Sequence, residues 1–124
     1  MADVQHLAAE HLEAARKAEN GRSAKVVVHD GPLRQSIIAL VAGIELAEHN
    51  SPPAASLQVL VGRVRVTGFD QAVLAAGELS VLTHARHAVL ALEDAVVLLT
   101  TVTGIPAPSP PEDTRTTSAV QDVP

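Results

Sequence analysis

The sequence predicts an all-β fold with a single α-helix at its N-terminus. Apolar residues recur with helical spacing only in residues 4–19, whereas residues 25–103 form a succession of short runs rich in Val, Leu and Ile. The 124 residues are 47% hydrophobic but only 1% aromatic, so aliphatic side chains must fill the core. A chain of this length forms one domain, since a domain contains roughly 100 to 200 residues.

Residues 4–19 have the pattern of an amphipathic helix. Asp3 can cap its first turn, and Asn20 with Gly21 supplies a left-handed stop. The apolar stripe is mostly alanine and buries little area by itself, so we expect it to lie against the sheet or against a partner subunit. It comprises Val4, Leu7, Ala8, Leu12, Ala15 and Ala18.

Nine short apolar runs follow the helix, and each is predicted to form a strand. Turn signals such as DGP at 30–32 and Gly62 stand between many of them. Many short strands at close spacing favour an antiparallel sandwich or barrel over βαβ units. In residues 63–67 the valines are expected to face the core and the arginines the solvent. The runs cover residues 25–29, 36–43, 44–49, 56–61, 63–67, 71–76, 78–82, 87–92 and 95–102.

Three segments are predicted along the chain. Residues 1–23 are the helix and a linker, and residues 24–103 are the β-rich domain. Residues 104–124 hold five of the eight prolines and show no sustained periodicity. Such a segment buries too little apolar surface to offset the entropy of ordering it, which predicts a flexible, disordered Pro-rich tail. An extended arm that lies on a neighbouring subunit is the alternative.

Composition excludes several classes of protein. The net charge of -5, with nine basic residues scattered along the chain, argues against nucleic-acid binding. The absence of cysteine excludes disulfides, thiolate catalysis and cysteine-based zinc sites, and it fits a reducing compartment. The acidic, polar N-terminus is unlike a signal peptide, and no apolar run approaches the roughly 18 residues of a membrane span. We therefore expect a cytoplasmic protein without a membrane partner.

Two glycine-anchored segments, residues 43–62 and 76–101, resemble the two motifs of the cupin superfamily. Residues 24–103 are similar to the small single-domain cupins of actinobacteria, and the residues before them resemble the N-terminal helix and first strand of those proteins. The resemblance implies a double-stranded β-helix, the cupin barrel, over residues 24–103. Cupins include dioxygenases, isomerases, storage proteins and sugar-binding regulators, so the resemblance implies a fold and no single reaction.

The first cupin motif reads G-x5-H-x-H-x3-4-E-x6-G. Gly43, His49 and Gly62 match it, with the expected spacing between Gly43 and His49. Ser51 stands at the place of the second histidine, and Ala55 at that of the glutamate. Two of the usual metal ligands are therefore replaced.

The second motif reads G-x5-P-x-G-x2-H-x3-N. Gly77 and His87 match it if one residue is deleted before the histidine, and Thr83 replaces the proline. The resemblance implies that His49 and His87 lie in one pocket.

A catalytic metal in this fold needs three or four nitrogen and oxygen ligands with an open position for substrate. His49 and His87 form an incomplete set, which Gln58 and His84 are second-rank candidates to complete. Strict alternation turns Gln58 to the other face unless a bulge intervenes. We expect a divalent metal such as Zn, Fe, Mn or Ni to be held weakly or not at all.

The other ionisable residues favour surface positions. His6 and His11 lie on the predicted helix and His29 on the first strand, without partners at ligand spacing. Glu93 and Asp94 are expected in a solvated turn between the last two strands.

The sequence leaves three functions open, and leaves open whether the protein is an enzyme. The first is a small-molecule-binding module with a degenerate metal site. The second is a metal-dependent cupin enzyme, an oxygenase or isomerase, with a histidine-based site. The third is a regulatory or stress-related scaffold that binds a protein partner. A homodimer is also expected, because the apolar runs 25–29 and 36–43 would otherwise expose edges able to pair with another chain.

Overall fold

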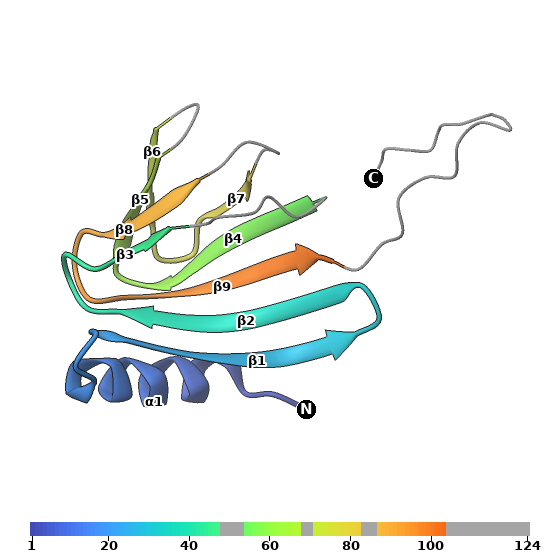
Figure 1. Ribbon diagram of the computed structural model, residues 1–124, viewed down its shortest axis with the longest axis horizontal. Helices are drawn as coiled ribbons and strands as arrows, with labels where there is room; N and C mark the ends of the chain where they lie inside the picture. Colours follow the sequence, from blue (N-terminus) through green and yellow to red (C-terminus); the bar gives the residue numbers. More distant parts are fainter. Residues whose placement is uncertain (48–53, 68–70, 83–86, 104–124) are drawn as a thin grey trace, which may run out of the picture.

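The computed structural model describes residues 1–47, 54–67, 71–82 and 87–103, which form one helix and nine strands (Figure 1). Each of the nine predicted runs overlaps one of the strands. The predicted tail, residues 104–124, lies outside the described residues. The elements are α1 (Val4–Lys17), β1 (Arg22–Asp30), β2 (Leu33–Leu40), β3 (Glu45–Ala47), β4 (Ala54–Val61), β5 (Arg63–Thr67), β6 (Ala72–Ala75), β7 (Leu79–Leu82), β8 (Ala88–Ala91) and β9 (Ala95–Val102).

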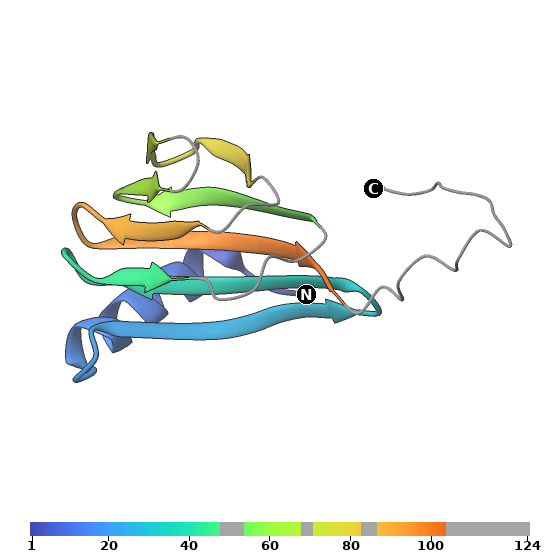
Figure 2. The ribbon, with the colours of Figure 1, turned by 45° about the horizontal axis from the view of Figure 1, so that its top comes forward.

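The strands form two sheets in which every pairing is antiparallel. The five-stranded sheet has the order β1-β2-β9-β4-β7, and the four-stranded sheet the order β3-β8-β5-β6. In Figure 2 the smaller sheet lies over the larger one. Side chains from both sheets meet in one cluster, called the interior here. Its buried members are Ile38, Leu40, Ala55, Leu57, Val59, Val64, Val66, Leu74, Leu82, Val89, Ala91, Ala95 and Val97.

Alternation along the strands determines which side chains enter the interior. In β5, Val64 and Val66 are buried and Arg63 is exposed, as the period-two pattern predicts. The interior cluster is entirely aliphatic, as the composition requires. The prediction of an all-β fold with an aliphatic core is therefore confirmed.

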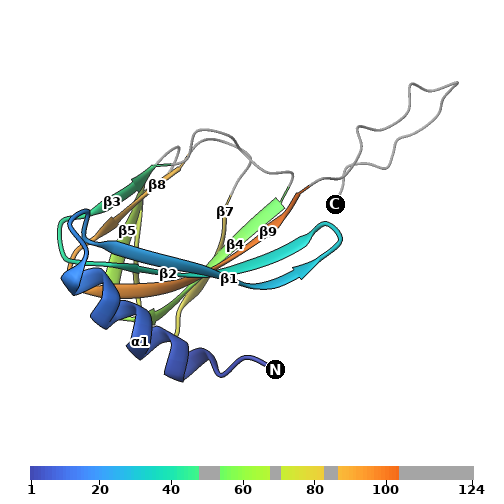
Figure 3. The same ribbon diagram turned by 60° about the horizontal axis from the view of Figure 1, so that its bottom comes forward.

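Helix α1 lies against the outer face of the five-stranded sheet (Figure 3). The Asp3 side chain accepts a hydrogen bond from the His6 amide and caps the helix as predicted, although the helix ends at Lys17 rather than at residue 19. The helix contacts the sheet, which was one of the two expected partners. A second buried cluster joins them, formed by Ala8, Leu12, Ala15, Ile37, Ala39 and Val96. Within the described residues, no helix is long and apolar enough to cross a bilayer.

The two ends of the sheets differ. At one, called the turn end, residues 92–94 connect β8 to β9. At the other, called the site end, β8 begins and β9 finishes. The register places the end of β3 beside Ala88, the end of β5 beside the same residue, and Ala54 beside Val102. Strands β3, β5 and β7 therefore finish, and β4, β6 and β8 begin, at the site end.

Of the two strands expected to expose a free edge, only one is an edge strand among the described residues. Strand β1, which contains residues 25–29, is an edge of its sheet, but β2, which contains most of residues 36–43, pairs with β1 and β9. The apolar sequence of β2 therefore reflects burial on both of its faces, and β2 is not an exposed edge. The other edge of the sheet is β7, whose Leu79 and Val81 are 64% and 75% exposed.

Gly62 provides a test of the packing at the turn end. It has φ +77°, and an added Cβ would overlap the carbonyl oxygen of Asp94. Gly43 has φ +89° with open space around it. A left-handed conformation costs a residue with a side chain about 1 to 2 kcal/mol. We expect Gly43→Ala to lower the free energy of unfolding by that amount, and Gly62→Ala by more than about 2 kcal/mol. Urea unfolding measures both, and equal losses would contradict the close approach.

Candidate functional site

His87 is the buried polar residue that the two sheets enclose at the site end. It is 8% exposed and immediately precedes β8, in which Val89 and Ala91 belong to the interior. His87 shares their alternation, so it faces the interior too. Among the described residues, no other polar or charged residue is buried to this degree.

A hydrogen bond fixes the ring of His87. Its Nδ1 lies 3.1 Å from the backbone oxygen of Thr67, at the end of neighbouring strand β5. A carbonyl oxygen only accepts, so Nδ1 donates, and in the neutral ring Nε2 is then the acceptor. The bond to Thr67 therefore fixes the orientation of the ring and, in its neutral form, its tautomer.

Ala55 occupies the place of the carboxylate ligand in the cupin motif. It lies on the interior face of β4, opposite Leu82 on β7 and Thr101 on β9, and it is buried in the interior cluster. A methyl group therefore faces the interior where the motif has a carboxylate. Ser51 lies outside the described residues.

Gln58 lies on the opposite face of β4. Its neighbours Leu57 and Val59 are buried in the interior, whereas Gln58 is paired with Leu98, which packs on the helix side of the sheet. The irregularity in β4 falls between Val59 and Val61, beyond Gln58, and so does not reverse its direction. The structure does not bring Gln58 together with His87 in the interior.

The other histidines are placed as follows. His49 and His84 lie outside the described residues, so their proximity to His87 stays a prediction. His6 is exposed, with Nε2 3.9 Å from Glu10, and His11 Nδ1 lies 2.7 Å from the hydroxyl of Ser23. Across residues 1–47, 54–67, 71–82 and 87–103, no three His, Asp or Glu side chains gather where they could hold a metal ion.

Arg34 is a site residue that the sequence analysis did not single out. It is paired with His29 on β1 and with Thr101 on β9, and Thr101 is in turn paired with Ala55 on β4. These four residues and Leu82 form one row across the interior face of the five-stranded sheet at the site end, called the arginine row. The alternation that places Ile38 and Leu40 in the interior places Arg34 on the same face. The predicted strand began at Ser36, however, and so did not include Arg34.

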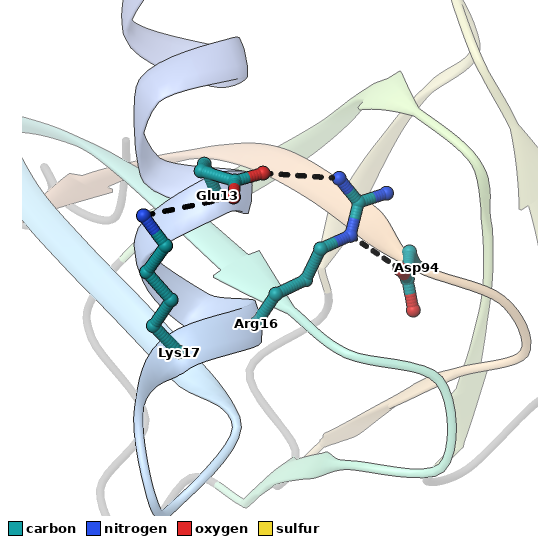
Figure 4. Close-up of polar contacts among 4 residues, drawn as sticks. All are labelled: Glu13, Arg16, Lys17 and Asp94. Carbon is teal, nitrogen blue, oxygen red and sulfur yellow. Dashed lines mark hydrogen bonds and ion pairs between the residues drawn. The ribbon is translucent and has the colours of Figure 1, made fainter.

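The carboxylates of the 92–94 turn form ion pairs at the opposite end. Asp94 Oδ1 accepts a hydrogen bond from the Ala42 amide at 2.9 Å, and its Oδ2 accepts one from Arg16 Nε at 2.9 Å (Figure 4). Glu93 pairs with Arg63 at 2.8 Å. The predicted turn is confirmed, and its carboxylates join elements of the fold.

The environment of Asp94 changes its acidity. The hydrogen bond from the Ala42 amide and then that from Arg16 lower the pKa of Asp94, and the bond to Asp94 raises the pKa of Arg16. Arg16 also lies 3.6 Å from Glu13, which in turn lies 3.8 Å from Lys17 (Figure 4). Asp94 therefore stays charged and holds the helix to the turn end, away from the site.

Comparisons with known proteins establish the fold. No family model matches the sequence, and no curated protein matches it. Solved structures do match. A cupin superfamily protein from Desulfitobacterium hafniense has a TM-score of 0.64 at 17% identity, with 70% of this chain and 82% of that one covered. KdgF from Halomonas sp. has a TM-score of 0.60 at 24% identity, covering 70% and 85%.

A larger enzyme also contains the fold. Salicylate 1,2-dioxygenase from Pseudaminobacter salicylatoxidans has a TM-score of 0.66 at 17% identity, with 78% of this chain but only 33% of that chain covered. At such identities the likeness shows the fold alone. The protein has the cupin fold with one N-terminal helix, as predicted, while the resemblance to actinobacterial cupins in particular stays a prediction.

The ion pair at the turn end predicts a dependence of stability on pH. Because folding lowers the pKa of Asp94, its bonds stabilise the fold above its ordinary pKa of 3.8, and this contribution is lost as the pH falls through the folded pKa. Asp94→Asn should unfold at a lower urea concentration than the natural protein at neutral pH. The difference should shrink below the ordinary pKa, and a difference independent of pH would contradict this account. Glu93→Gln on the same turn is the matched control.

Proposed function

We propose that the chain is a small-molecule-binding module of the cupin fold whose metal site is degenerate. The observation that supports this most directly is His87, a buried imidazole with a fixed ring at one end of an aliphatic interior. Small-molecule sites typically combine apolar surface with a few polar groups in defined positions. His87 is such a group, and the Val and Leu side chains of the interior provide the apolar surface.

The described donor set does not fit the metal that cupins usually hold. A first-row divalent ion needs about three or four nitrogen and oxygen ligands. Here Ala55 presents a methyl group at the position of the carboxylate, and Gln58 lies on the other face of its strand. We therefore assign no chemical step to Zn, Fe, Mn or Ni in this protein.

The proposal is tested with 1-hexanol, a small aliphatic alcohol that carries one polar group. In a methyl NMR titration, signals of interior residues Leu57, Leu82 and Val89 should move with a common saturation curve. The methyl groups of Val73, which is 50% exposed on β6, provide the control within the same chain. Equal shifts of both sets would indicate binding to the surface and contradict the proposal.

The alternative is a metal-dependent oxygenase or isomerase. The observation in its favour is the shared fold with salicylate 1,2-dioxygenase. It requires tight metal binding, in which His49 and His84 would take part with His87. It also requires activity on a substrate that is not yet defined.

Titration with Zn²⁺ separates the two functions. For the binding module, the untagged protein and His87→Gln should both give up Zn²⁺ to a weak chelator. If the natural protein kept Zn²⁺ at submicromolar free concentration and His87→Gln released it, the enzyme would become the better account.

We also propose that the protein forms a homodimer. Strand β7 supports this, because its free edge carries the exposed side chains of Leu79 and Val81. A two-fold axis would pair this edge with itself. Sedimentation at micromolar concentration should give twice the monomer mass, and Val81→Lys should give the monomer. Binding of a different protein along the same edge would instead support the regulatory scaffold.

A further inference from the structure

Arg34 is a charged residue on the interior face of β2. Ile38 on the same strand belongs to the interior, while Ile37 packs against the helix on the outer face. Because strand side chains alternate, Arg34 and Ser36 share the interior face with Ile38. Arg34 also belongs to the site end, because β2 begins where β9 finishes.

The hydrogen bonds of the Arg34 guanidinium are incomplete. Its Nη2 lies 3.1 Å from His29 Nε2, and since arginine only donates, the imidazole nitrogen accepts. Its Nε is buried and has no hydrogen-bond partner among the described residues. A buried donor on a charged group is costly to leave unpaired, so this atom favours a hydrogen-bond acceptor.

The surface beside Arg34 is amphipathic. On the neighbouring strand Thr101 stands directly opposite, and its hydroxyl is a further donor. In the next row toward the core, Val26 and Leu99 flank Ser36. Val26 is 50% exposed and Leu99 is partly buried against the interior cluster. The cationic guanidinium of Arg34 therefore borders an aliphatic surface that continues into the interior.

We propose that Arg34 binds the carboxylate of an aliphatic organic acid, whose chain lies over Val26 and Leu99 toward the interior. One edge of a guanidinium presents Nε–H and one Nη2 hydrogen, which match the two oxygens of a carboxylate, and Nη2 keeps its other hydrogen for His29. The inference deepens the proposed function and rests on it, because it names the class of ligand for the same interior.

The position of Arg34 also explains why an anion suits this row. Ala55, at the place of the motif's carboxylate, lies two strands from Arg34, which corresponds to about 10 Å between the backbones. The arginine row contains a fixed positive charge and no carboxylate. Its electrostatic potential therefore attracts an anionic group and opposes a divalent cation.

Hexanoate, 1-hexanol and acetate test the inference as three probes. Hexanoate has both the carboxylate and the chain, and each of the other two lacks one of them. Binding is followed through the Arg34 Nε–H signal and the methyl signals of Val26 and Leu99. We expect hexanoate to bind about tenfold more tightly than either other probe, and to shift the Nε–H signal.

Two variants with the same change of charge complete the experiment. Arg34→Gln should remove the advantage of hexanoate over 1-hexanol and leave the binding of 1-hexanol unchanged. Arg65→Gln is the matched control, because Arg65 alternates with the buried Val64 and Val66 of β5 and so faces outward. It should retain the advantage. Arg34→Lys keeps the positive charge but lacks the paired donors of the guanidinium. It should therefore retain only part of the advantage of hexanoate over 1-hexanol.

The outcomes distinguish this inference from the function on which it rests. If 1-hexanol binds in the interior but hexanoate gains nothing from Arg34, the carboxylate site is wrong and the binding module stands. If none of the three probes reaches the interior methyl groups, the binding module itself is overturned. Amide spectra of the variants show whether each remains folded.

Discussion

The position of β9 between β2 and β4 is the constraint on which the rest of the structure depends. Val97 faces the interior and Val96 faces the helix, so this strand is buried on both sides over its first residues. Its pairing with β2 and β4 extends over nearly its whole length and fixes the rows across the sheet. The register of β9 therefore determines both where the helix packs and which polar residues meet at the site end.

Much of the fold could be predicted because its signals are local. The cap at Asp3, the nine strands and the inward valines of β5 each depend on neighbouring residues in the sequence. The contact of Arg16 with Asp94 joins residues that are 78 positions apart, and it exists only because the helix crosses the sheet at a particular place. Periodicity carries no information about such a crossing.

The site could be predicted only in part. Motif spacing identified His87, which the structure buries in the interior, and alternation already indicated the outward direction of Gln58. Arg34 was missed because its role depends on the cross-strand partners His29 and Thr101, which follow from register rather than from sequence spacing. A motif lists positions along the sequence, so it cannot include partners that only strand pairing brings together.

The aliphatic character of the interior has a consequence for selectivity. In the described part of the chain, the interior cluster consists of Val, Leu, Ile and Ala, and Phe69 lies outside the described residues. Branched aliphatic walls attract a guest through dispersion and offer no ring on which a flat molecule could stack. In the proposed binding module, such side chains would distinguish ligands by shape and volume, and chemical discrimination would depend on the few polar atoms at the site end. A flexible saturated chain can adapt its conformation to these side chains more readily than a rigid planar molecule can.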